Sequence, residues 1–205
     1  MRHSHLAAVF AVPVALVALA GCGDDAVTVH RTDTNAVRDL SGNWNATDAQ
    51  ETAKALIAKA MAQPWADDFR AAHNNTKPVI KIGRIRVEVP GEVIATDIFT
   101  DDLVPALQES GKVKVVASNA ENDQAREERK QQDVHASAAT RKESFQETGS
   151  DFLLVGTIKT QTDQQGGQQQ KFYAITIKVT DVKTQEQIGF WSHKIEKDVS
   201  RANYK

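Results

Sequence analysis

The sequence contains almost no cysteine, since Cys22 is the only one among 205 residues. A single thiol forms no disulfide within the chain, so an apolar core must stabilise the fold. Hydrophobic residues make up 40% of the sequence, enough for such a core at this length. The chain also lacks an excess of either charge, because 25 basic residues face 27 acidic ones. This balance argues against binding to nucleic acid and against strong electrostatic attraction to anionic lipids.

The motifs of common catalytic sites are also missing. There is no Gly-x-Ser-x-Gly nucleophile elbow, no Gly-x-x-x-x-Gly-Lys-Ser/Thr phosphate loop and no Gly-x-Gly-x-x-Gly. We therefore expect no enzymatic activity, no cofactor and no metal site. The histidines beyond the first 21 residues are His30, His73, His135 and His193, and they are scattered without metal-ligand spacing. For His193 we expect a structural or surface role.

Two pairs of adjacent carboxylates remain as catalytic candidates, Asp67-Asp68 and Asp101-Asp102. Neighbouring side chains on a helix point about 100° apart, so the two members of a pair would not share a proton or a substrate atom. Acidic residues are favoured in the first turn of a helix, and we expect both pairs to be solvated residues of that kind.

What the chain does contain is an export signal at its start. Residues 1–5 carry Arg2, an unbroken apolar run covers residues 6–19, and Leu19-Ala20-Gly21-Cys22 closes it. A basic start, an apolar run and small residues before a cleavage site are typical of a secretory signal. The run is shorter than the roughly 20 residues of a transmembrane helix, and Pro13 interrupts it.

The four closing residues match the bacterial lipobox, in which the cysteine thiol receives a lipid, as in palmitoylated lipoproteins, and the cysteine becomes the new N-terminus. We predict that residues 1–21 are a removed signal peptide and that Cys22 is the lipidation site. Gly23 behind the cysteine favours sorting to the outer membrane, facing the periplasm, while Asp24 one place later leaves inner-membrane retention open. The alternative is a chance cysteine after an ordinary signal.

Residues 22–39 follow as a lipidated cysteine and a short polar leader, and residues 40–205 form a single globular domain. The domain begins with an amphipathic helix, for which Thr47 and Gln50 have the spacing of a capping box. Pro64 ends this helix and a second short one follows. We expect Trp44 and Trp65 to pack on the core. The apolar face of the first helix carries Ala49, Ala53, Leu56, Ile57 and Ala60.

A strand, a helix and a parallel strand come next. Residues 79–89 are rich in Val and Ile and predict the first strand. Residues 96–110 predict the helix, with Gly111 as its end and Pro105 kinking it or moving its start later. The joining helix makes the strand at residues 112–117 parallel to the first. The apolar face of this helix carries Phe99, Leu103, Ala106 and Leu107.

Residues 121–148 are the most charged part of the chain and include Arg126-Glu127-Glu128-Arg129-Lys130. Mixed charges at this spacing usually form a solvated helix face, here one helix or two broken near His135. A partner-binding surface is the alternative.

The last third predicts a three-stranded antiparallel meander. Residues 151–160 form a central strand, and residues 161–170, with Gly166-Gly167 in the middle, form a long polar hairpin loop. The returning strand places Tyr173, Ile175, Ile177 and Val179 on one face, and residues 187–195 form the last strand. The fold class is therefore α/β (α+β), a mixed sheet of about four to five strands flanked by helices.

Several stretches in this order resemble the penicillin-binding-protein activator LpoB family, over residues 39 to about 195. The resemblance implies a lipoprotein of the outer membrane that is not an enzyme and that binds and stimulates a bifunctional class A penicillin-binding protein in peptidoglycan synthesis, and hence in cell-wall biogenesis and cell shape. It also implies a domain similar to the TolB N-terminal domain. The matching stretches are Asp39 to Asn45, Ile98 to Leu103, Ser110 to Val113, Gly149 to Gly156 and Tyr173 to Val179.

The leader departs from the family, whose best-known members have a long proline-rich one. Here residues 23–39 contain no proline and span about 55–60 Å when extended, or about 23 Å as a flexible coil. We expect a monomer anchored to the membrane through its N-terminal lipid. For partner binding we single out the charged helix and the hairpin with the residue that follows it: Arg126, Arg129, Lys130, Gln169, Lys171 and Phe172.

Two other functions remain open on the sequence alone. One is a secretion or assembly lipoprotein of the outer membrane related to the curli secretion component, which would need long alternating strands on oligomerisation. The other is a periplasmic ligand-binding protein or hydrolase, which would need a deep pocket with several convergent polar groups.

Overall fold

The structure is a computed structural model that describes residues 29–34, 36–37, 39–116, 119–135 and 148–200. The predicted signal peptide and the predicted lipidation site, Cys22, lie outside these residues. The chain divides into two units, Met1–Thr34 and Asn35–Lys205, and the elements below all belong to the second unit. No helix among the described residues is long and apolar enough to cross a membrane.

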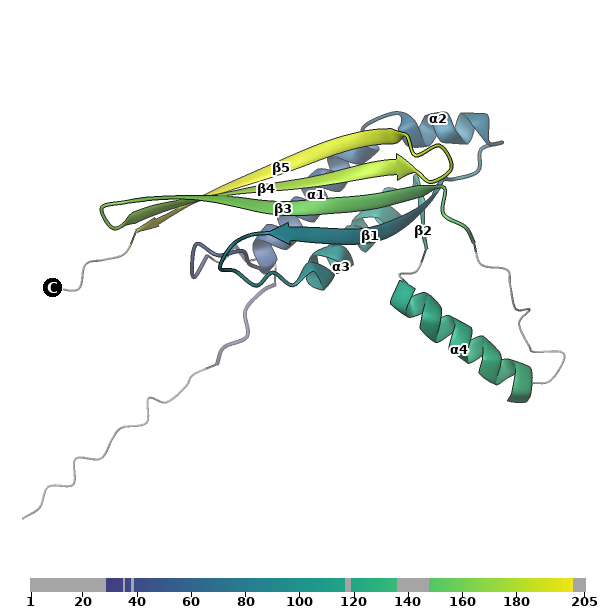
Figure 1. Cartoon of the computed structure of the whole chain (residues 1–205), viewed down its shortest axis with the longest axis horizontal. Coiled ribbons are helices and arrows are strands. Elements are labelled where there is room, and N and C mark those ends of the chain that lie inside the picture. The colour runs from purple at the N-terminus through teal and green to yellow at the C-terminus, as the bar shows by residue number, and fades with distance from the viewer. Residues whose placement is uncertain (1–28, 35, 38, 117–118, 136–147, 201–205) are drawn as a thin grey trace, which may run out of the picture. The chain divides into compact units, whose positions relative to one another are not determined.

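A five-stranded mixed sheet organises the second unit (Figure 1), as the sequence predicts. Its spatial order is β2-β1-β3-β4-β5. Strand β1 pairs in parallel with both β2 and β3, the central strand, and β3, β4 and β5 form an antiparallel meander. The strands are β1 (Val79–Glu88), β2 (Lys114–Val116), β3 (Phe152–Gln165), β4 (Gln168–Asp181) and β5 (Gln187–Ser200).

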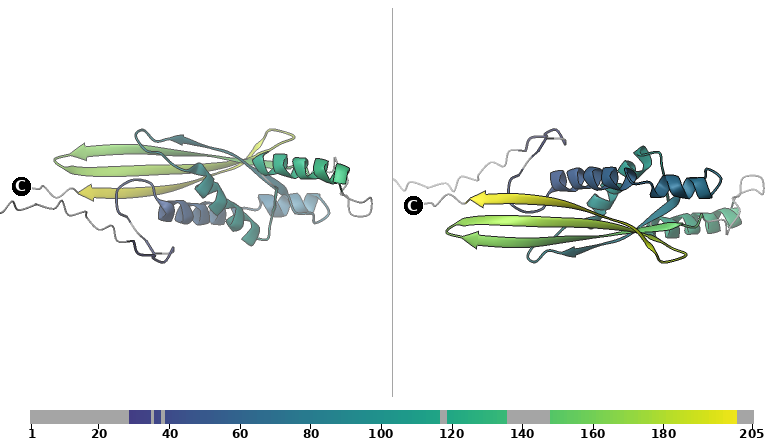
Figure 2. Two further views of the ribbon diagram at one scale, coloured as in Figure 1. Left: turned by 90° about the horizontal axis from the view of Figure 1, so that it is seen from below. Right: turned by 90° about the horizontal axis from the view of Figure 1, so that it is seen from above.

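Helices α1 (Ala46–Met61), α2 (Trp65–Ala72) and α3 (Thr96–Glu109) lie on one side of the sheet (Figure 2). The fourth helix, α4 (Asn119–His135), is the charged segment. The predicted cap of α1 is wrong. Asn45 is the N-cap, and its side chain accepts a hydrogen bond from the Asp48 backbone N–H while the Asp48 carboxylate accepts from the Asn45 N–H. A box with an acidic N3 residue therefore forms two positions earlier than Thr47.

Helix α3 buries Phe99, Leu103 and Leu107 completely, which confirms its predicted apolar face. Pro105 lies inside the helix on its exposed side, and the helix still begins at Thr96, so the predicted later start is wrong. A proline costs the backbone hydrogen bond of its own nitrogen and leaves the preceding turns in place. Gly111 follows the helix with φ +66°, a conformation that favours glycine, as expected for a helix end.

The core lies between the sheet and the three helices. Alternate residues of β4 point into it, with Tyr173, Ile175 and Ile177 fully buried. Two of the three tryptophans pack on it edge to face, Trp44 against Phe99 and Tyr173, and Trp65 against Phe152 at 5.3 Å between ring centroids. The prediction of aromatic packing is therefore confirmed.

The hairpin between β3 and β4 corrects the predicted ten-residue loop. Both strands continue through that segment, and only Gly166 and Gly167, with φ of +58° and +83°, form the turn. Strand β5 likewise continues to Ser200, beyond the predicted end at Ile195. Polar glutamines occupy both faces of these strand ends, so the alternation that marks a half-buried strand is absent from the sequence there.

Candidate partner-binding surface

The side of the sheet away from α1, α2 and α3 is called the open face here (Figure 2). It is built by the residues of each strand that alternate with the buried ones. Strand pairing sets Lys81 beside Leu153, Val155 beside Lys178, and Thr157 beside both Arg86 and Thr176. Its remaining members on β4 and β5 are Phe172, Ala174, Thr180, Phe190, Ser192, Lys194 and Glu196.

Two phenylalanines of the open face each lie beneath a lysine. The Lys194 Nζ is 5.6 Å from the centre of the Phe172 ring, and the Lys178 Nζ is 5.7 Å from that of Phe190. Phe190 keeps 52% of its surface exposed. Phe172 and Lys178 are six residues apart on β4, so the two pairs lie about 20 Å apart along the sheet. Aromatic and cationic groups arranged in this way are frequent in protein interfaces.

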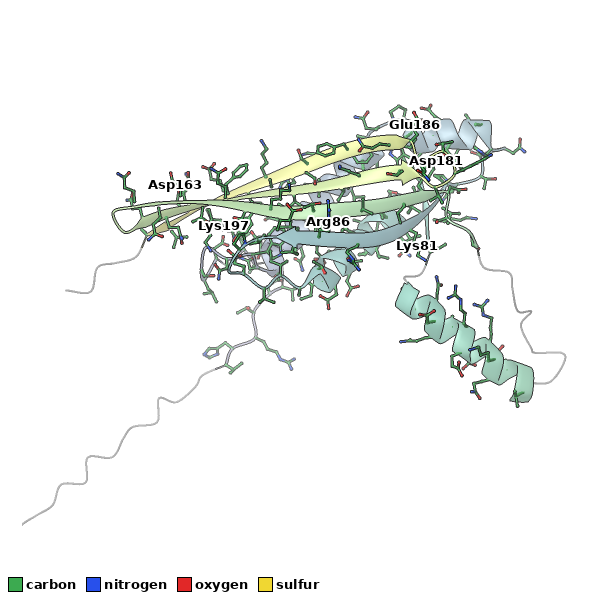
Figure 3. All side chains as sticks on the ribbon, viewed as in Figure 1. Lys81, Arg86, Asp163, Asp181, Glu186 and Lys197 are labelled. Carbon is green, nitrogen blue, oxygen red and sulfur yellow. The ribbon has the colours of Figure 1, made fainter. Side chains whose placement is uncertain are left out.

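The charge of the open face is positive although the whole chain has a formal net charge of −2. Its carboxylates are Glu88, Asp163, Glu196 and Asp198, against five cations, and Glu88 forms an ion pair with Lys159 at 3.1 Å. Such a face attracts an acidic partner. Its cations are Lys81, Arg86, Lys159, Lys178 and Lys194, the first two of which are labelled in Figure 3.

On the covered face, cations are instead enclosed with carboxylates beneath residues 39–45, called the strap here. The Lys197 Nζ donates to Asp39 at 2.7 Å and to Asp48 at 2.6 Å, and Asp48 is itself buried. The Lys171 Nζ donates to Glu92 at 2.7 Å. The Tyr173 hydroxyl donates to the Glu92 carboxylate, with its two oxygens at 2.7 and 2.8 Å. These contacts fasten the strap to β4 and β5.

The pKa values within this cluster follow from the contacts. Burial would raise the pKa of Glu92, but hydrogen bonds from Lys171, from the Trp44 backbone N–H and from Tyr173 lower it below its usual range. Burial and the Glu92 carboxylate raise the pKa of Tyr173. Burial lowers the pKa of Lys197, and Asp39 and Asp48 more than offset this, so the net direction is up. Glu92 and Lys197 are therefore held in their charged forms.

The six predicted partner-binding residues lie in four different settings. Phe172 is on the open face, whereas Lys171 points to the covered face with 12% of its side chain exposed. Gln169 lines a shallow polar hollow at the hairpin tip. On α4, Arg126 pairs with Asp123 at 2.9 Å, Lys130 pairs with Glu127 at 3.3 Å and Arg129 donates to the Ala125 carbonyl oxygen. Their role in binding stays a prediction.

Sequence reasoning missed most of the open face, including Lys178, Phe190 and Lys194. Their alternation with buried residues is visible in the sequence, but their proximity depends on the pairing of β4 with β5. The strap was missed for a stronger reason, because Lys197 and Asp48 are separated by 149 positions.

The catalytic candidates do not come together. Asp67 and Asp68 lie in the first turn of α2, as expected, but Asp101 and Asp102 lie in the second turn of α3, so that prediction is wrong for them. Asp102 is half-buried, and burial together with Asp101 raises its pKa.

His193 is also half-buried, and burial lowers its pKa. Over the described part of the chain, no three potential ligands are grouped to hold a metal ion.

The arrangement thus defines a small α+β domain with one covered and one open sheet face. A family model described as "Peptidoglycan-synthase activator LpoB" matches residues 48–196. The chain therefore belongs to the LpoB family, a family of regulatory activators of peptidoglycan synthases. This membership agrees with the resemblance seen in the sequence.

Similar solved structures include the LpoB C-terminal domains of Salmonella enterica and Escherichia coli. Each is 17% identical to this chain and covers 75% of it and 99% of the other domain, with TM-scores of 0.40 and 0.41 respectively. Lipoprotein GNA1162 of Neisseria meningitidis is 18% identical over 62% of this chain and 87% of its own, with a TM-score of 0.39. No curated protein matches the sequence.

Proposed function

We propose that this protein binds a bifunctional class A penicillin-binding protein in the periplasm and stimulates its peptidoglycan synthesis. The observation that carries this proposal is the family match over residues 48–196. The protein itself catalyses no step. It acts as a regulator whose docking favours the active population of the synthase.

The protein reaches its partner from a lipid on Cys22 after removal of residues 1–21, and Gly23 directs it to the outer membrane. The folded domain is fastened from Asp39 onward by the strap. Residues 23–38 then connect the lipid to the domain. Labelling of growing cells with a palmitate analogue tests this anchor, and a Cys22→Ser variant that still takes up the label would contradict it.

The open face is the docking surface in this proposal. Phe172 and Phe190 supply apolar contact area, and the surrounding lysines pair with an acidic region of the synthase. Because exposed charges steer association, binding through this face weakens as the salt concentration rises.

The experiment is a pull-down of purified class A synthases of the same organism with the full chain, combined with a glycan-polymerisation assay. Reversal of two open-face charges, Lys178→Glu with Lys194→Glu, should lower affinity at least about tenfold and abolish stimulation. Lys183→Glu, a single charge reversal of the same kind in the exposed β4–β5 turn, is the control. The proposal is refuted if the unaltered chain shows no binding and no stimulation at micromolar concentration.

A further inference from the structure

A groove of about 600 Å³ lies between the α1–α2 corner and the first residues of β5. The helices contribute Gln63, Pro64, Trp65 and Asp68, and the other wall runs from residue 186 to residue 191. Its volume is within the range of small-ligand sites. Phe190 borders both this groove and the open face, so it carries no part of the argument below.

Trp191 forms the floor of the groove's apolar part. Its six-membered ring lies directly over Gly189, where a Cβ atom would collide with the ring. The glycine therefore permits the indole to lie along the strand. Among the described residues, nothing accepts a hydrogen bond from the Trp191 Nε1–H, whereas the buried Trp65 Nε1 donates to the Ala60 carbonyl oxygen at 2.9 Å. Trp65 is bound into the core, and Trp191 keeps a free donor beside an aromatic surface.

Polar side chains line the same groove as this indole. Asp68 is exposed, as is Glu186, which is labelled in Figure 3. Within the described part of the chain neither carboxylate has an ion pair or a hydrogen-bond donor. Neighbouring Asp67 differs, because its carboxylate pairs with Lys112 at 2.7 Å and with Arg70 at 3.7 Å. The amides of Gln63 and Gln187 complete the set, and no cation from the described residues lines the groove.

The turn that presents Glu186 is fixed before any ligand binds. The Asp181 carboxylate accepts hydrogen bonds from the backbone N–H groups of Lys183 and Thr184 at 2.8 and 2.7 Å. These bonds hold the pKa of Asp181 below its usual range, so the carboxylate stays charged at neutral pH. A preorganised turn reduces the entropy lost when a ligand is bound.

We propose that this groove binds the glycan strand of peptidoglycan, a neutral chain of β-linked N-acetylated amino sugars. The apolar face of a pyranose ring stacks on the Trp191 indole, whose Nε1–H can donate to an acetamido or hydroxyl oxygen. The Asp68 and Glu186 carboxylates accept hydrogen bonds from sugar hydroxyls, and the glutamine amides both donate and accept.

The charge of the groove selects among possible occupants. Two carboxylates without a cation repel anionic groups, such as lipid phosphates and the carboxylates of peptide stems. The sugar backbone is the neutral, hydroxyl-rich part of the polymer that peptidoglycan synthases, the enzymes this family activates, produce. Through this groove the protein binds the cell wall independently of docking to a synthase.

The test is co-sedimentation of the full-length chain with purified peptidoglycan sacculi, without any synthase, and competition by soluble chitotetraose. We expect binding that chitotetraose displaces. The double variant Asp68→Asn with Glu186→Gln should bind about tenfold more weakly, because two hydrogen bonds to charged acceptors are weakened. Asp67→Asn is the matched control, since it removes the neighbouring carboxylate that is already paired, and it should bind like the unaltered chain.

Trp191→Ala should abolish displacement by chitotetraose. Because that substitution removes a partly buried side chain, its fold is checked by circular dichroism, and the exposed double variant decides the outcome if the alanine variant is unfolded. Absence of sacculus binding, equal binding of the double variant and the unaltered chain, or competition by free stem peptides but not by chitotetraose would each overturn the proposal. A failure here leaves synthase stimulation intact, so the two proposals are separable.

Discussion

On the covered face of the sheet Lys197 lies between two carboxylates, whereas on the open face Lys194 lies over an aromatic ring in contact with solvent. The two lysines are three positions apart on one strand, yet their surroundings give them different uses. A charge that is enclosed with its counter-ions stays paired within the folded protein and is not available to a partner. A charge over an exposed ring remains available to a partner. Strand alternation alone separates these roles.

The largest effect on the free energy of unfolding is expected for a substitution on the covered face. Lys197→Met leaves the buried Asp48 carboxylate without its cation, and we expect a loss of about 3 kcal/mol in the free energy of unfolding. Urea denaturation followed by circular dichroism measures it. A loss below about 1 kcal/mol would show that the strap contributes little to stability.

A smaller effect is expected for Tyr173→Phe. The substitution removes the hydroxyl that bonds Glu92 and that lies 3.0 Å from the Gly42 carbonyl oxygen, while keeping the ring packed against Trp44. We expect a loss of about 1–2 kcal/mol by the same urea assay. Tyr204→Phe, outside the described residues, is the control substitution of the same chemistry.

The pH dependence of stability sharpens the comparison further. The pKa of Glu92 is lower in the folded state than in the unfolded chain, so its contribution is present above the unfolded pKa of about 4.3 and is lost as pH falls through the folded value. Below about pH 5 the unfolding free energy of Glu92→Gln should therefore decline less steeply than that of the unaltered chain. Parallel curves would contradict this assignment.

The smallest stability effect is expected on the open face. Lys194→Met removes only the contact with Phe172, and we expect a change of about 0.5 kcal/mol or less in the free energy of unfolding. The same variant should weaken synthase binding measurably, in surface plasmon resonance at low salt. A large stability loss with unchanged binding would reverse the roles assigned to the two faces.

The sequence predicted those elements whose signal is local. Ala53, Leu56 and Ile57 mark the buried face of α1, and Tyr173, Ile175 and Ile177 mark that of β4, because burial on one face imposes a fixed period. The ends of β3 and β4 escaped prediction, since glutamines on both faces leave no period to detect. Of the predicted site residues, Phe172 lies on the open face, while the structure turns its neighbour Lys171 to the opposite face.

The sequence by itself determined the order of helices and strands and the family resemblance, and it predicts an export signal that ends at the single cysteine. Those properties reside in consecutive residues or in short periods. Only the tertiary structure decided which lysines are enclosed, that Trp191 lies over Gly189, and that the strap is fastened to β4 and β5. Except for the contact of Trp191 with Gly189, two positions away on the same strand, these contacts join residues far apart in the chain. Their geometry follows from strand register and helix packing, which no local pattern specifies.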